Sequence, residues 1–121
     1  MRDKSLGAFG EDLAARFLES RGYKILERNF KVKWGEMDII AQDRGTICFV
    51  EVKLRTSDHF GLPQEAVEIR KRRKLARVAQ GYLKIKFRTD QRKSRFDVVA
   101  ICRDSEGNYS PELFQNAFEC P

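Results

Sequence analysis

The strongest constraint on the fold comes from two runs of β-forming residues that flank the pair Arg44-Gly45. Asp38 opens a short apolar run at residues 39–41, and a second run at residues 46–55 is rich in β-branched and aromatic side chains. An Arg-Gly turn signal between two such runs is typical of a β-hairpin. With a loop of two or four residues, the numbers of paired residues sum to 89. A three-residue loop would shift this register by one.

This register brings charged residues together. It places Asp38 opposite Glu51 and Glu36 opposite Lys53, and residues 51 and 53 lie on one face of their strand. Carboxylates among apolar strand residues are costly unless they are paired or bind a cation. Two converging carboxylates suit Mg²⁺ or Mn²⁺, and a neighbouring lysine can orient or deprotonate an attacking water. The alternative is an ordinary surface hairpin with solvated charges on its exposed face.

The spacing Asp38…Glu51-x-Lys53 resembles the PD-(D/E)xK signature of the restriction-endonuclease-like nuclease superfamily. Met37 stands where the name of the motif has proline. Longer strings resemble the YraN-like branch, which is similar to archaeal Holliday-junction resolvases. These strings are G-E-x-D at 35–38, F-V-E-V-K-x-R at 49–55 and R-F-D-V-V at 95–99. The likeness extends from about Gly7 to Phe118.

The resemblance implies a fold class and a set of roles. The fold is α/β (α+β), with a restriction-endonuclease-like αβββαβ core whose mixed sheet is flanked by helices. Asp38 and Glu51 would hold Mg²⁺ or Mn²⁺ together with the Val52 carbonyl, and Lys53 would assist the attacking water. Glu11, in the first helix, matches an acidic family position that contributes to the metal site. Glu11 could equally be a favourable acid in the first turns of a helix.

Two helices are predicted from apolar periodicity, at residues 5–21 and from Gln64 to about Leu83. The second helix has an apolar face, which contains Leu75, Val78, Ala79 and Tyr82. Towards the N-terminus this face continues with polar residues, among them Gln64 and Lys71. A helix that is polar inside along its first half is expected where that half borders an active site. Gln64 and Lys71 are therefore candidates to orient a phosphate or a water, unless this end simply frays into solvent.

A basic tract at residues 70–95 holds 12 of the 24 Lys and Arg residues and one acid, Asp90. Such a concentration favours a polyanionic partner, although it could also be a solvated helix face. Beside a phosphodiesterase site, nucleic acid is the better interpretation, with affinity that falls as salt rises. The residues expected to contact nucleic acid are Arg55, Arg70, Lys71, Arg73, Lys74 and Arg77.

The rest of the chain is predicted more coarsely, as one domain over residues 1–121. The lone Trp34 could stack on a base or sugar, or pack against the protein. Asp97 is expected to make a structural bond rather than bind metal. Further predicted elements are a strand at 23–30, a mobile loop at 84–95, a strand at 96–102, a turn at 104–110 and a short helix or last strand at 113–118.

The composition of the chain bears on its cellular location. No apolar stretch has the length of a membrane span, and the N-terminus lacks the apolar core of a signal peptide. The three cysteines are odd in number and lack metal-ligand spacing, which favours reduced thiols and a cytoplasmic location. We expect no membrane partner. A homodimer is consistent with the resemblance, since nucleases that cut both strands or junctions are often dimers.

The leading hypothesis is a metal-dependent endonuclease that hydrolyses phosphodiester bonds in DNA, with branched or structured DNA implied by the likeness to resolvases. Its main rival is a catalytically silent nucleic-acid-binding protein with the same fold. A third possibility is an interaction module whose basic helix binds an acidic protein. RNA stays open as a substrate, because nothing in the sequence distinguishes a ribose 2′-hydroxyl.

Overall fold

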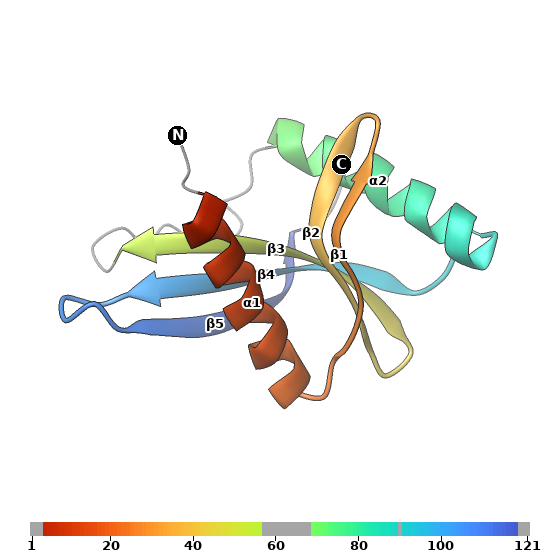
Figure 1. Ribbon diagram of the computed structural model, residues 1–121. Helices are drawn as coiled ribbons and strands as arrows, with labels where there is room; N and C mark the ends of the chain where they lie inside the picture. The colour runs from red at the N-terminus through yellow and green to blue at the C-terminus, as the bar shows by residue number, and fades with distance from the viewer. Residues whose placement is uncertain (1–3, 57–68, 90, 119–121) are drawn as a thin grey trace.

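The computed structural model describes residues 4–56, 69–89 and 91–118, and it shows an α+β protein built on one mixed sheet (Figure 1). Strands lie in the order β1-β2-β3-β4-β5. Only β3 and β4 are parallel to each other, and the remaining neighbours are antiparallel. The elements are α1 (Lys4–Ser20), β1 (Lys24–Val32), β2 (Gly35–Asp43), β3 (Thr46–Thr56), α2 (Ile69–Phe87), β4 (Ser94–Arg103) and β5 (Tyr109–Phe118).

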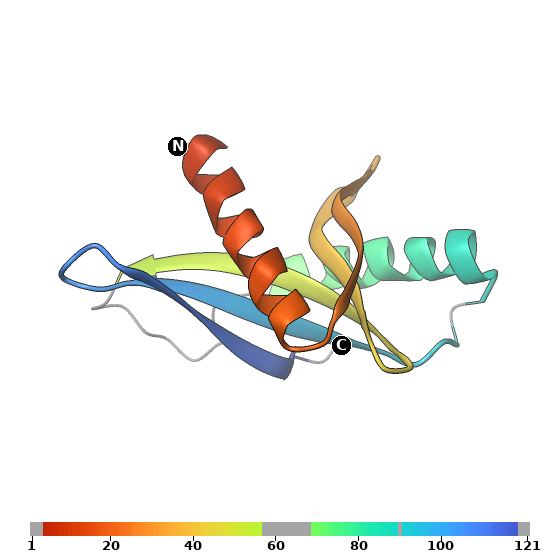
Figure 2. The same ribbon diagram turned by 60° about the horizontal axis from the view of Figure 1, so that its bottom comes forward.

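The two helices cover opposite faces of the sheet. Side chains of β3 alternate between the faces, so Cys48 and Val50 pack with α1 while Ile47 and Phe49 pack with α2. Figures 1 and 2 show α1 crossing the sheet obliquely and α2 running beside the β1–β2 hairpin. Because both faces of β3 are buried over residues 47–50, this part of the strand is apolar throughout. Within the described residues, no helix is long and apolar enough to cross a membrane.

The predicted register of the central hairpin is confirmed. Paired residue numbers sum to 89 from Asp43↔Thr46 to Ile39↔Val50, around a two-residue loop in which Arg44 has a φ of 61°. The ladder ends at Ile39, because β2 then leaves β3 and rises with β1 towards α2 (Figure 1). The sequence had predicted that Asp38 pairs with Glu51 and Glu36 with Lys53, and neither pair belongs to the ladder. Glu36 lies opposite Lys31 in β1 instead.

The predicted mobile loop at 84–95 is wrong at both ends. The second helix continues to Phe87, whose ring lies 6.2 Å from that of Tyr82, and β4 already begins at Ser94. The Ile47 N–H donates to the Lys93 carbonyl at 3.0 Å, which aligns the start of β4 with β3. Charged residues on both sides of Phe87 hid this extra turn of α2 from the sequence pattern. The predicted start of the helix, from Gln64, lies outside the described residues.

Residues 113–118, left open between helix and strand, belong to β5. Its ladder with β4 is irregular between Phe96 and Val98. At this irregularity Asn116 has a φ of 50°, and its N–H donates to Asp97 Oδ1 at 2.9 Å. A buried acceptor on β4 thus takes a backbone donor of β5 that the ladder does not use. The predicted strands at 23–30 and 96–102 correspond to β1 and β4.

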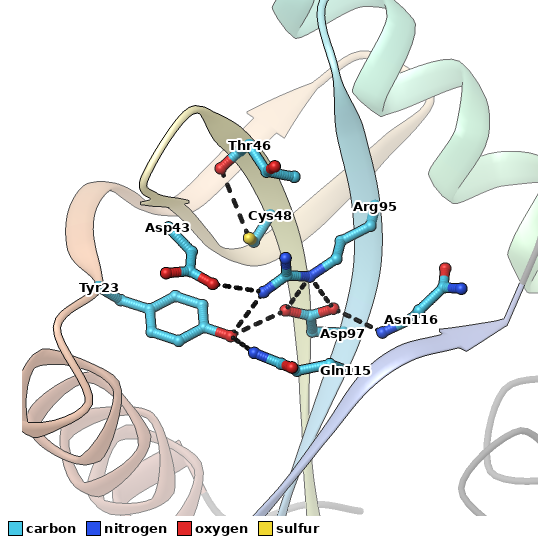
Figure 3. A network of polar contacts seen from close by, with 8 residues as sticks. All are labelled: Tyr23, Asp43, Thr46, Cys48, Arg95, Asp97, Gln115 and Asn116. Atoms are coloured by element: carbon cyan, nitrogen blue, oxygen red, sulfur yellow. Dashed lines mark hydrogen bonds and ion pairs between the residues drawn. The ribbon is translucent and has the colours of Figure 1, made fainter.

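Asp97 is the centre of a polar network on the α1 face (Figure 3). Its carboxylate is fully buried and accepts hydrogen bonds from Arg95 Nε at 3.0 and 3.1 Å and from the Tyr23 hydroxyl at 3.3 Å. Burial lowers the pKa of Arg95, but its bonds to Asp97 and Asp43 outweigh burial and raise it. The "Asp97 network", a structural tie as expected for Asp97, consists of Tyr23, Asp43, Arg95, Asp97, Gln115 and Asn116.

Candidate active site

A buried glutamate marks the candidate site on the other face of the sheet. Glu51 is 3% exposed and lies on the α2 side of β3, next to Phe49 in that face's alternation. Two lysines face it. Lys71 Nζ lies 2.8 Å from Glu51 Oε2, and Lys53 Nζ lies 4.0 Å from the same oxygen. The Glu51 carboxylate therefore faces one ammonium group from α2 and one from its own strand, β3.

Asp38 reaches the same site from β2. Its Oδ2 accepts a hydrogen bond from the Val52 N–H at 2.9 Å, just beyond the last pair of the β2–β3 ladder. Where the strands begin to separate, the aspartate side chain thus replaces a strand as the acceptor for a β3 amide. This bond orients one carboxylate beside the backbone that carries the other. The Val52 carbonyl as a metal ligand stays a prediction.

The environment disfavours the charge on Glu51. Burial raises the pKa of Glu51, the charge of Asp38 raises it further, and Lys71 and Lys53 act in the opposite direction. Desolvation and a nearby like charge are two of the three general causes of a raised carboxyl pKa. Such a pair is relieved by a cation, by a proton or by the lysines already present. A buried carboxylate whose pKa is shifted by burial and by a specific charged neighbour is a frequent feature of functional sites.

The two lysines are shifted in opposite directions. The pKa of Lys53 is lowered to about 8, first by burial and then by the hydrogen bond and charge of Lys71. Burial also lowers the pKa of Lys71, but the charge and hydrogen bond of Glu51 outweigh burial and raise it. Lys71 thus stays an ammonium that neutralises Glu51. Lys53 is neutral in part of the molecules near pH 8, and a neutral amine can accept a proton.

The sequence predicted that the polar first half of α2 would border this site, and the Lys71–Glu51 contact agrees with that prediction. The other residue proposed from the same helix face, Gln64, lies outside the described residues. Lys71 was also expected to contact nucleic acid. Its ammonium contacts Glu51, on the inner side of the helix, and its contact with nucleic acid stays a prediction.

Glu11 does not complete a three-acid metal cluster. Within residues 4–56, 69–89 and 91–118, no group of three or more His, Cys, Asp and Glu could hold a metal ion. With its amide turned to donate, the Asn29 side-chain nitrogen lies 2.8 Å from Glu11 Oε1, so Glu11 is bound to β1. Asp38 and Glu51 are the two acids that fit a metal here. Two carboxylates suit Mg²⁺, which keeps several waters and takes further oxygens from a phosphate.

The remaining predicted nucleic-acid contacts divide into two groups. Arg70, Arg73, Lys74 and Arg77 are exposed along α2. Arg55 is partly buried, and its guanidinium donates to the Leu54 carbonyl at 3.1 Å. The exposed group forms a row, because residues three and four apart on a helix are neighbours. Sequence reasoning missed that Lys84 extends this row, since it assigned residue 84 to a loop. The spacing 70, 74, 77, 81, 84 was the available signal.

Fold and site together define an α+β protein with two carboxylates and two lysines gathered where a mixed sheet opens. The family model described as "Uncharacterised protein family UPF0102" matches residues 10–101, and the chain belongs to this family.

Three relatives show how far the similarity extends. The chain is 49% identical over 113 residues to a UPF0102 protein of Syntrophus aciditrophicus (strain SB), covering 93% of this chain and 87% of that protein. It is 43% identical over 118 residues to one of Clostridium botulinum (strain Loch Maree / Type A3), covering 97% and 96%. A third relative, from Caldanaerobacter subterraneus subsp. tengcongensis, is 47% identical over 103 residues, covering 85% and 84%.

Proposed function

We propose that this protein is a metal-dependent endonuclease that hydrolyses phosphodiester bonds in DNA. One observation carries the proposal: a buried Glu51 near Asp38, with Lys53 beside it at a pKa lowered to about 8. The resemblance of Asp38…Glu51-x-Lys53 to the PD-(D/E)xK signature, and of the longer strings to YraN-like proteins, supports the same reaction.

Asp38 and Glu51 would hold Mg²⁺ or Mn²⁺, with the Val52 carbonyl as a further ligand. A metal bound there would polarise the phosphoryl oxygens and stabilise charge that develops on phosphorus. The fit rests on the donor set of two hard carboxylates, in a site that disfavours the charge of Glu51. The Val52 N–H fixes Asp38 at 2.9 Å, so this carboxylate is oriented by the strand.

The chain supplies the proton transfer. Neutral Lys53 accepts a proton from the attacking water, whose oxygen forms a new bond to phosphorus. The bond between phosphorus and the leaving oxygen breaks, and that oxygen takes a proton from solvent. Lys71 keeps its charge, because Glu51 raises its pKa, and it offsets negative charge on the phosphate. The opposite shifts of the two lysines thus assign them different roles.

The basic row on α2 would bind the DNA backbone. Arg70, Arg73, Lys74 and Arg77 begin directly beside Lys71, so a phosphate chain along α2 would lead into the site. Contacts to phosphate give affinity with little sequence information, and that affinity falls as salt rises. Branched DNA is the substrate class that the likeness to resolvases favours.

The test is cleavage of a four-way DNA junction and a matched linear duplex with Mg²⁺ or Mn²⁺, for the wild type and for Asp38→Asn, Glu51→Gln and Lys53→Gln. We expect each substitution to reduce the cleavage rate at least about 100-fold, the lower range for general acid–base groups. DNA binding should persist in all three. Glu36→Gln is the matched control, since Glu36 is an exposed acid on the same strand that faces Lys31.

Two results would contradict the proposal. Equal cleavage by wild type and Asp38→Asn would point to a contaminating nuclease. DNA binding without cleavage of either substrate, in either metal, would favour the catalytically silent nucleic-acid-binding protein.

A further inference from the structure

A hollow lies away from the candidate site, between the turn of the β1–β2 hairpin and α2. It has a volume of about 490 Å³ and is lined by Trp34, Arg77, Gln80, Gly81 and Lys84. We call it the Trp34 groove. The indole of Trp34 is 51% exposed, although most large apolar side chains of the described chain are buried. Its volume falls within the range of about 300–1,000 Å³ that is usual for ligand pockets.

The indole is held in position by contacts between the hairpin and the helix. Gly35 follows it, and a Cβ at Gly35 would lie 3.0 Å from Val78 Cγ2, so the hairpin approaches α2 as closely as a glycine allows. On the neighbouring strand, the Phe30 ring meets Tyr82 edge-on at 5.2 Å. A Cβ at Gly81 would lie 3.7 Å from Trp34 Cζ2, so Gly81 leaves the space beside the ring open.

Charge connects the groove to the candidate site. Arg70, Lys74, Arg77 and Lys84 follow one another at helical spacing on one side of α2, and Gly81 interrupts them at the groove. At about 1.5 Å of rise per residue, Arg77 lies roughly 9 Å along the helix from Lys71, which holds Glu51. A polyanion that follows this row from the site therefore reaches the indole within a few nucleotides.

We propose that the Trp34 groove binds an unpaired base of single-stranded nucleic acid, stacked on the indole, with Arg77 and Lys84 against the flanking phosphates. The inference rests on the proposed function only for nucleic acid as the partner, and it does not require cleavage. An exposed aromatic ring beside a basic row is the combination that binds single strands, because every base has a π-face. An acidic peptide would use the cations but would have no need of the indole.

The protein offers a direct readout, since Trp34 is its only tryptophan. Indole fluorescence is titrated with oligo(dT), oligo(U), a blunt duplex of equal length and heparin, in EDTA and low salt so that no cleavage occurs. We expect saturable quenching by the single strands and little by the duplex or heparin. The two single strands distinguish DNA from RNA as the source of the base.

Variants test the stacking itself through the anisotropy of labelled oligonucleotides. Trp34→Ala should weaken single-strand binding roughly 5- to 150-fold, the range of one base–aromatic stack. Gly81→Leu should weaken it similarly by filling the groove, while leucine favours the helix more than glycine. Arg77→Gln should lower the salt dependence by about one contact. Lys24→Gln is the charge control, because this exposed lysine lies at the other end of β1.

The inference is overturned if the duplex quenches as strongly as the single strands, or if Trp34→Ala and Gly81→Leu bind single strands as tightly as the wild type. Its failure is separable from that of the proposed nuclease. Quenching by single strands without any cleavage would retain the groove and reject the nuclease. Cleavage of the junction with unchanged binding in both variants would do the reverse. No binding of any nucleic acid would reject both.

Discussion

Asp97 and Glu51 are two buried acids on the neighbouring strands β4 and β3, one residue apart in the register. They differ in the face of the sheet that they occupy and in their partners. In the parallel ladder, Val50 pairs with Asp97 and Glu51 pairs with Val98. Their side chains therefore lie on opposite faces, Asp97 towards α1 and Glu51 towards α2. Both are nearly or fully inaccessible to solvent, at 0% and 3% exposure.

Their partners distinguish them. Asp97 is enclosed by directional donors: a guanidinium, a phenol and a backbone N–H, all within 3.3 Å. Glu51 faces two ammonium groups, at 2.8 and 4.0 Å, and the like charge of Asp38. Hydrogen bonds of fixed geometry hold a strand in place. A lysine ammonium beside a carboxylate can be replaced there by a metal ion, and it can then turn to a phosphate. Burial of an acid alone therefore does not mark a functional site.

The largest effect on stability is expected from removing the Asp97 carboxylate from its network. Asp97→Ala leaves the Arg95 guanidinium partly buried, with Asp43 as its remaining carboxylate. Removing one partner of a buried ion pair typically costs about 3–5 kcal/mol. We expect a loss of this size in the free energy of unfolding, measured with urea. A loss below about 1 kcal/mol would show that the Asp97 network is not a main tie of the sheet.

The pH dependence of cleavage tests Lys53. Its pKa is lowered from 10.5 to about 8, so its neutral fraction rises about tenfold per pH unit up to pH 8 and then levels off. If neutral Lys53 is the base, the single-turnover rate should follow this fraction and become constant above about pH 9. Lys53→Arg should remove the rise, because arginine does not lose its proton. A wild-type rate that is independent of pH between 6 and 8 would contradict this role.

Glu51 should oppose folding at neutral pH. Its pKa is raised in the folded state, so the fold binds this proton more tightly than the unfolded chain does. Stability from this group is present below pH 4.5 and is lost as pH rises through the folded pKa. Glu51→Gln should therefore stabilise the protein at pH 7 by about 0.5–2 kcal/mol, the usual gain at such sites. Urea unfolding at pH 7 and pH 4.5 should show the gain shrinking at the lower pH, and a destabilised variant at pH 7 would contradict the sign.

The smallest expected effect concerns Lys71. Its side chain is 43% exposed, so its pair with Glu51 is screened by solvent. Lys71→Gln removes a cation that competes for Glu51, and we expect Mn²⁺ to bind about two- to fivefold more tightly, in line with the modest energy of partly exposed pairs. Cleavage should fall in the same variant. Weaker metal binding would mean that Lys71 supports the metal site instead of competing with it.

Sequence reasoning found the parts of the fold that depend on local periodicity. The 89-sum register followed from two strand patterns and a two-residue turn, and it brought Asp38 to the strand of Glu51. The prediction of a Glu36–Lys53 pair was wrong, because β2 leaves β3 and the β1–β2 turn packs against α2. The alternation of apolar and polar residues in a strand does not encode this tertiary contact. The position of Lys71 could be predicted, because Lys71 lies on the continuation of the apolar face of α2 towards the N-terminus of the helix.

Other features depend on residues that are distant in the chain. The Asp97 network joins residues from four segments of the chain, between Tyr23 and Asn116, and no local pattern links them. The Trp34 groove needs a hairpin turn and a helix about fifty residues later to meet, at glycines whose role appears only in three dimensions.

The central claim is that Asp38 and Glu51 form one metal site. Titration calorimetry with Mn²⁺ and Mg²⁺, alone and with a short DNA duplex, tests it on the wild type, Asp38→Asn, Glu51→Gln and the Glu36→Gln control. We predict binding by the wild type and Glu36→Gln that is lost in both site variants. Binding that survives in both variants, or absence of binding by the wild type even with DNA, would contradict the claim.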